Sequence, residues 1–128
     1  MSCYWDAIIR ELSEQEAARA GLAGIKDPVV FATKLKEAGA NCFVLSKWHG
    51  AALSEQQRRE NAAAVAAYNT DTVRDGYYCG SCDPFLLLVA HVAGVNIHHE
   101  TPTGTFDYSS QYPAARWITL RSNSRHMH

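Results

Sequence analysis

Apolar residues recur at intervals of three and four along much of the chain before residue 95, which predicts amphipathic helices. The first such pattern comes directly after Cys3, with Trp5, Ile8, Ile9 and Leu12 as its apolar positions. The sequence 13–16 then has the Ser-x-x-Glu spacing of a capping box, which predicts a short second helix to about residue 20.

Two further helices are predicted between residues 27 and 68. Asp27-Pro28 is typical of a helix start, and we expect the helix after it to end near Gly39. Its expected inward face consists of Val29, Val30, Ala32 and Leu35. Ser54 and Gln57 have capping-box spacing and open a helix to about residue 68, whereas residues 41–48 are ambiguous between helix and buried strand.

The most apolar segment, residues 85–93, is predicted to be a buried helix. Asp83-Pro84 provides its start signal and Gly94 its end. Apolar residues occupy nearly every side of this helix, so it must be covered on more than one side.

From residue 95 onward the pattern changes to short strands. The segments 95–99, 106–109 and 115–121 are bounded by turn residues, and Ile118 and Leu120 alternate with Trp117, Thr119 and Arg121. We therefore expect one α+β domain over residues 1–128, with N-terminal helices and a small C-terminal sheet.

Composition narrows the class of protein. The chain has 128 residues, of which 47% are hydrophobic and 20% charged, and its formal net charge is −1. These values predict a soluble globular protein with no general attraction to nucleic acid or to acidic membranes. The longest apolar run, residues 84–93, is too short to span a bilayer. The four cysteines do not suggest a secreted disulfide framework, so a cytoplasmic location is expected.

Cys3 is the leading candidate for catalytic chemistry. A cysteine at a helix start lies at the positive end of the helix dipole, which favours the reactive thiolate. Such a nucleophile needs a histidine base, and His126 follows a predicted strand and the polar segment 122–125. His91 is expected in the core, while His98 and His99 should point to opposite faces of their strand.

Three segments in order resemble the ovarian-tumour (OTU) class of cysteine proteases, most of which are deubiquitinases. The first is Cys3-Tyr4-Trp5-Asp6-Ala7-Ile8, which is similar to the family's cysteine motif. The second is the glycine-containing turn 76–81, followed by the apolar helix and Val95-Asn96-Ile97. The third is Trp117-Ile118-Thr119-Leu120 with His126-Met127 beyond it, similar to the family's strand and histidine.

The resemblance implies a papain-type fold and a protease that removes ubiquitin or a ubiquitin-like modifier without a cofactor or metal. Cys3 would be the nucleophile and His126 the base, with Asn123 or His128 orienting the base if the site is not a dyad. Ser2, Tyr78 and Gly80 would lie beside the oxyanion site. A monomer is expected, either a viral protease domain or a bacterial effector acting in the host cytosol.

The chain departs from the family pattern in two ways that keep alternatives open. Only Met1 and Ser2 precede Cys3, where the family has an Asp-Gly-Asn run, and one glycine of the usual pair is replaced by Cys79. Cys42 is the second-ranked nucleophile, because Asn41-Cys42-Phe43 also suits the cysteine motif.

Two other classes of function are left open. The protein would be a ubiquitin-binding module if the fold were kept and catalysis lost. Alternatively, Cys79 and Cys82 have the spacing of a redox or zinc pair, for which His98 or His99 would supply further zinc ligands.

Overall fold

A computed structural model describes residues 3–39, 47–48, 51–71, 83–102, 104–110 and 115–121, with the backbone alone for Cys3 and for 47–48 and 51–52. Its elements in chain order are α1 (Cys3–Glu11), α2 (Glu14–Arg19), α3 (Pro28–Gly39), β1 (Lys47–Trp48), β2 (Ala51–Ala52), α4 (Glu55–Ala67), α5 (Pro84–Ala93), β3 (Asn96–Thr101), β4 (Gly104–Tyr108) and β5 (Trp117–Arg121). The predicted order, helices first and a small sheet last, is confirmed.

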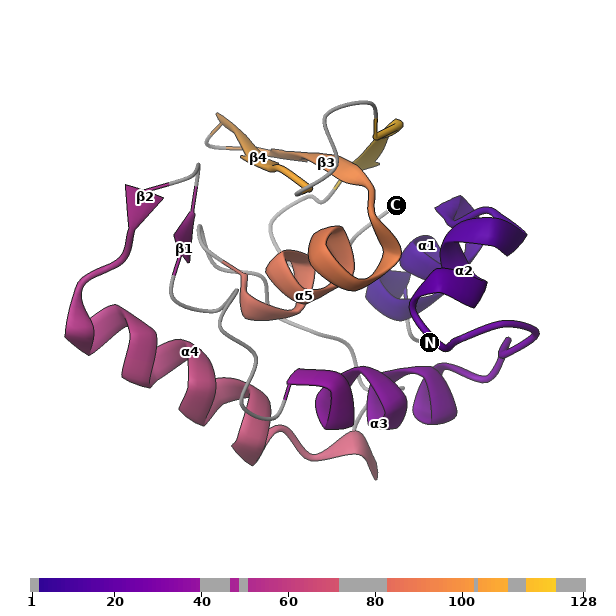
Figure 1. Ribbon diagram of the computed structural model, residues 1–128, viewed down its shortest axis with the longest axis horizontal. Helices are drawn as coiled ribbons and strands as arrows, with labels where there is room; N and C mark the ends of the chain where they lie inside the picture. Colours follow the sequence, from indigo (N-terminus) through magenta and orange to yellow (C-terminus); the bar gives the residue numbers. More distant parts are fainter. Residues whose placement is uncertain are drawn as a thin grey trace.

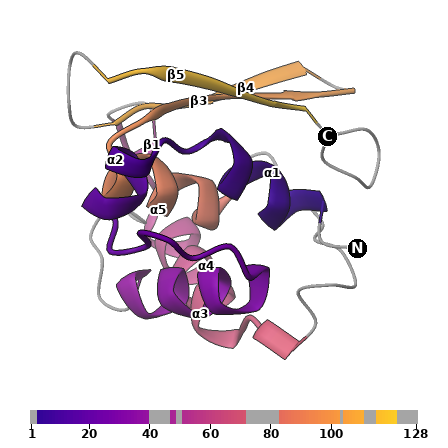
Figure 2. The same cartoon turned by 90° about the vertical axis from the view of Figure 1, so that its right-hand side faces the viewer.

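The three-stranded sheet forms one layer above the helices (Figures 1 and 2). Its strand order is β4-β3-β5, with β3 antiparallel to β4 and parallel to β5. Helix α5 lies directly beneath it, and α3 and α4 lie farther from the sheet (Figure 1). The mixed helix and sheet architecture agrees with the α+β prediction.

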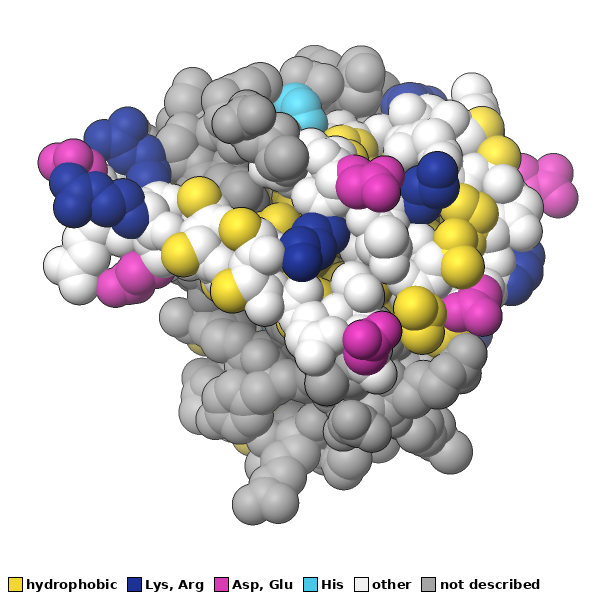
Figure 3. Space-filling view, turned by 90° about the horizontal axis from the view of Figure 1, so that it is seen from below, with side chains coloured by type: hydrophobic (Ala, Val, Ile, Leu, Met, Phe, Trp, Pro, Cys, Tyr) yellow, Lys and Arg dark blue, Asp and Glu magenta, His cyan; other side chains and the backbone are white. Residues whose placement is uncertain are grey.

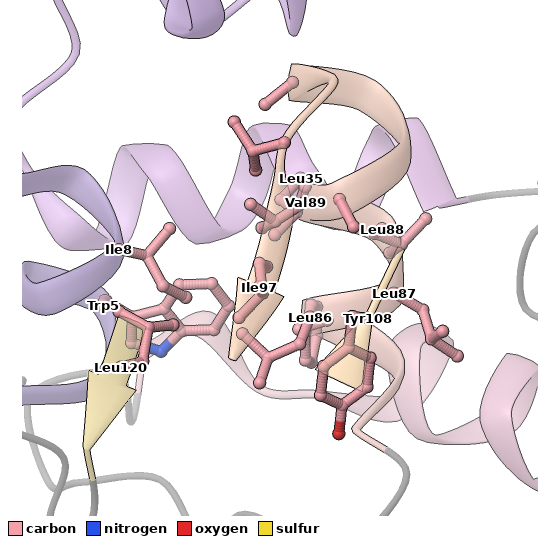
Figure 4. Packing of buried hydrophobic residues seen from close by; sticks show 14 of the residues in the cluster. Trp5, Ile8, Leu35, Leu86, Leu87, Leu88, Val89, Ile97, Tyr108 and Leu120 are labelled. Carbon is pink, nitrogen blue, oxygen red and sulfur yellow. The ribbon is translucent and has the colours of Figure 1, made fainter. Parts of the chain in front are cut away.

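Helix α5 is the centre of the core, as predicted. Its start is fixed by Asp83, whose Oδ1 accepts a hydrogen bond of 2.9 Å from Phe85 N, and by Pro84 in the first turn. Its end is fixed by Gly94, which adopts the left-handed conformation at φ 70°. Eight of its ten residues are buried, and Figure 4 shows its leucines packed among side chains from α1, α3 and the sheet.

The sheet has one covered face and one open face. Ile97, Tyr108, Ile118 and Leu120 point toward the helices and are buried. His98, Asp107 and Trp117 point to the opposite face and are half-buried or exposed, because successive side chains of a strand point to opposite faces. The aliphatic face predicted for residues 117–121 is confirmed.

Local signals set most helix boundaries. The predicted inward face of α3 is confirmed at Ala32 and Leu35 but was wrong at one position. The Ser13–Glu16 capping box is complete, while the Ser54 side chain caps α4 by accepting from Gln57 N. In α3, Val30 was expected to point inward but is 43% exposed. The buried side of α3 instead consists of Pro28, Phe31, Ala32, Leu35 and Gly39, which follow the helical period more closely.

An ion pair between Arg116 and Glu16 joins the two halves of the chain. Arg116 Nη2 donates to Glu16 Oε1 at 2.6 Å and to the Glu11 carbonyl at 2.6 Å. Burial alone would raise the pKa of the Glu16 carboxyl, but hydrogen bonds from Arg116 and Ser13 outweigh it, so this pKa lies below its ordinary value. The carboxylate form of Glu16 therefore stabilises the folded state.

Among the helices that the structure describes, none is both long and apolar enough to cross a membrane.

A charge in the middle of α5 is expected to unfold the domain. Leu88 is fully buried, so Leu88→Asp would place an unpaired carboxylate in the core, at a cost comparable to the whole stability of a small domain. The matched control is Ala64→Asp on the exposed side of α4, which should leave a cooperative unfolding transition. Circular dichroism melts of both variants test this. A cooperatively folded Leu88→Asp protein would contradict the assignment of α5 to the core.

Replacing Glu16 should make the free energy of unfolding depend less on pH in the acidic range. The folded pKa of Glu16 is lowered, so its contribution is present above the unfolded-state value of about 4.3 and is lost as pH falls through the folded value. We expect Glu16→Gln to cost about 1 kcal/mol at pH 7 and progressively less below pH ~4.3. Urea unfolding between pH 3 and 7 measures this. Glu14→Gln removes an exposed carboxylate from the same turn and should have a smaller effect.

Candidate functional site

Cys3 is the one predicted catalytic residue that falls within the described part of the chain. It is the first residue of α1, as expected. The other predicted site residues lie outside the described residues: Ser2, Cys42, Tyr78, Gly80, Asn123, His126 and His128. Among the described elements, α1 carries Cys3 and β5 is the last one before His126.

The first turn of α1 is anchored by aromatic side chains. Trp5 is fully buried, and its ring contacts Tyr4 and Phe85 edge-on at centroid distances of 4.8 and 5.1 Å. Trp5 Nε1 donates a hydrogen bond of 3.0 Å to the hydroxyl of Tyr68, which follows α4. Burial raises the pKa of that hydroxyl, so it remains protonated at neutral pH. Cys3 thus begins a helix whose next two residues are fixed in the core.

A hydrogen-bonded network links the same turn to α5 and to the sheet. Tyr4 donates through its hydroxyl to Asp83 Oδ2 at 2.9 Å, and Asp83 caps α5 through its other carboxylate oxygen. The Asp83 backbone N–H donates to the Tyr108 hydroxyl, also at 2.9 Å, at the end of β4. The sequence indicated Asp83 as a helix cap, but nothing local in it indicated that two distant tyrosines converge there.

Helix α1 and strand β5 contact one another and run in opposite directions (Figure 2). Their adjacent ends are joined where Arg116, just before β5, donates to the carbonyl of Glu11, the last residue of α1. Because α1 extends about 12 Å and residues 116–121 about 17 Å, the end of β5 lies on the same side of the molecule as Cys3.

His98 and His99 occupy opposite faces of β3, as predicted. His99 points to the helix side and is fully buried, and this burial lowers the pKa of its imidazole, so that it stays neutral near pH 7. His98 points to the open face, on the other side of the sheet from α1. The sheet therefore separates His98 from Cys3.

The open face carries a cluster that the sequence did not reveal. His98 Nδ1 lies 2.6 Å from Asp107 Oδ1, and the imidazole stacks on the Trp117 indole at a centroid distance of 4.0 Å. Strand pairing places these side chains together, since His98 is opposite Asp107 in register. With Nδ1 donating to the carboxylate, Nε2 carries the free lone pair. This geometry suits hydrogen bonding or metal binding at Nε2.

Two hollows occur among the described helices. One of about 430 Å³ is lined by Ile9, Leu12, Leu22 and Phe31, among others, and lies at the end of α1 away from Cys3. The other, about 640 Å³, lies between α3 and α4, beside Lys36 and Val65. Figure 3 shows the face made by these two helices, where separate positive and negative side chains surround small hydrophobic patches.

Within the described ranges, no group of three or more His, Cys, Asp or Glu side chains is arranged to hold a metal ion. The zinc and redox hypotheses depend on Cys79 and Cys82, which lie outside those ranges.

The chain was compared with known proteins at three levels. No protein-family model, no curated protein and no solved structure matches it. The function must therefore be argued from the geometry and from the sequence motifs.

Proposed function

We propose that this protein is a cysteine-dependent isopeptidase or peptidase, similar to the OTU proteases, that removes ubiquitin or a ubiquitin-like modifier. Cys3 is its nucleophile and His126 its base, with Asn123 or His128 orienting the base. It is proposed to act in the cytosol, where thiols remain reduced.

The observation that carries this proposal is the antiparallel packing of α1 against β5. The start of α1, at Cys3, and the end of β5, the strand that precedes His126, lie on the same side of the molecule (Figure 2). Four residues lie between Arg121 and His126, and the five steps of chain that join these two residues reach up to about 17 Å. The short stretch of chain before His126 therefore starts on the same side of the molecule as Cys3, whereas His98 lies on the open face of the sheet.

The proposed reaction begins at Cys3. The dipole of α1 favours the Cys3 thiolate, which attacks the carbonyl carbon of the scissile amide. His126 holds the proton from Cys3 and then gives it to the leaving amine, which leaves a thioester on Cys3. Water hydrolyses that thioester with His126 as base. Backbone N–H groups around Ser2 and Cys3 stabilise the oxyanion in both steps.

Replacing the nucleophile should abolish activity without unfolding the domain. Cys3→Ala is expected to lose both cleavage of modifier conjugates and labelling by a ubiquitin probe with a C-terminal electrophile, while its melting temperature changes by only about 2 °C. Cys42→Ala is the matched control and should keep both activities. An adduct that mass mapping places on Cys42 would refute the assignment to Cys3. Modifier binding without cleavage by the wild type would favour the binding-module alternative.

Loss of the base should affect turnover more than binding. His126→Ala is expected to reduce turnover by roughly a hundred- to ten-thousand-fold, with binding of the modifier retained. His128→Ala should do less, because an orienting group acts through its neighbour. The control is His98→Gln on the open face, which should retain turnover. If His126→Ala remained active while a folded His99→Gln variant did not, the base would be assigned to β3.

A further inference from the structure

We propose that Tyr4, Asp83 and Tyr108 form a positioning unit that sets the rotation and depth of the first turn of α1, the turn that Cys3 begins. This inference rests on the proposed function of Cys3 as a nucleophile. None of the three is a catalytic residue, since they act through the placement of Cys3.

The contacts of Asp83 exceed what a helix cap requires. Capping of α5 uses Oδ1, which accepts from Phe85 N at 2.9 Å. The second oxygen, Oδ2, accepts from the Tyr4 hydroxyl at the same distance. Asp83 is 1% exposed, and a carboxylate is costly to bury unless its hydrogen bonds are satisfied. A serine or asparagine would also cap the helix, and the second carboxylate oxygen of the aspartate adds the contact with Tyr4.

Directional bonds give this turn a constraint that apolar packing alone does not supply. The ring of Trp5 on the next position is held among Tyr4, Phe31, Tyr68 and Phe85. Hydrophobic contact is non-directional and tolerates small shifts along and around the helix axis. The hydrogen bond from Tyr4 to Asp83 fixes both, because its length and angle change with either movement. Cys3 precedes Tyr4 in the same turn, so this bond also restrains the backbone position of Cys3.

Tyr108 connects the first turn of α1, through Asp83, to the sheet. Its hydroxyl accepts from the Asp83 backbone N–H, and its ring lies in the core beside Leu86 (Figure 4). Tyr108 also pairs with Ile97 on β3, the central strand to which β5 is hydrogen-bonded. The same network thus connects the helix that carries Cys3 with the sheet whose last strand leads to His126. An active-site thiol and base need such common support, because small displacements cost much of the rate.

The test measures the reactivity of Cys3 directly, without any modifier. Iodoacetamide is used to alkylate the wild-type protein and two variants, Tyr4→Phe and Tyr108→Phe, between pH 5 and 10. Mass mapping then quantifies the adduct on Cys3. Tyr4→Phe removes one oxygen and keeps the ring. We expect the midpoint of its alkylation profile to rise by roughly half a unit, as the thiolate loses alignment with the helix dipole. On a modifier conjugate, kcat should fall roughly tenfold with KM unchanged.

The control separates positioning from general loss of stability. Ser13→Ala removes the cap of α2 at the other end of α1, so it should lower the midpoint of urea unfolding and leave the Cys3 profile unchanged. The proposal is overturned if Tyr4→Phe and Tyr108→Phe, like Ser13→Ala, lower the midpoint of urea unfolding but leave the alkylation profile of Cys3 unchanged. It also fails if either folded variant keeps the wild-type profile. Should Cys3→Ala still cleave conjugates, the proposed function fails separately, since the alkylation comparison does not depend on it.

Discussion

The burial of α5 is the constraint on which the rest of the structure depends. A ten-residue helix that is apolar on nearly every side must be covered from every direction. Helices α2, α3 and α4 contact it from one side and strands β3 and β4 from the other. The packing is close enough that a Cβ on Gly39 would lie 2.7 Å from Leu88 Cδ1. The helices before residue 70 and the strands after residue 95 therefore meet through α5.

The second organising feature is that α1 is tied at both ends to the C-terminal half of the chain. Tyr4 bonds to Asp83 at its start, and Arg116 bonds to the carbonyl of Glu11 at its end. These contacts join residues far apart in the sequence and leave little freedom for the helix to slide or turn. A helix held in this way is a suitable support for a nucleophile, since precise placement depends on supporting side chains.

The two faces of the sheet place His98 and His99 in different environments. The covered face keeps His99 neutral and buried, whereas the open face exposes His98 with Asp107 and Trp117. The candidate base therefore has to come from a segment that reaches the helix side of the sheet. On the proposed function the base is His126, which follows β5 in the sequence, and β5 ends on the same side of the molecule as the start of α1 (Figure 2).

The sequence by itself determined the elements and much of their burial, because caps, glycines and apolar periodicity act over a few residues. The capping box at Ser13, the cap at Asp83 and the alternation at Ile118 and Leu120 were all predictable in this way. Only the tertiary structure decided that β5 lies parallel to β3, that Tyr4 meets Asp83, and that His98 stacks on Trp117. Those contacts depend on strand register and on helix packing around α5, and neither is encoded by the spacing of neighbouring residues.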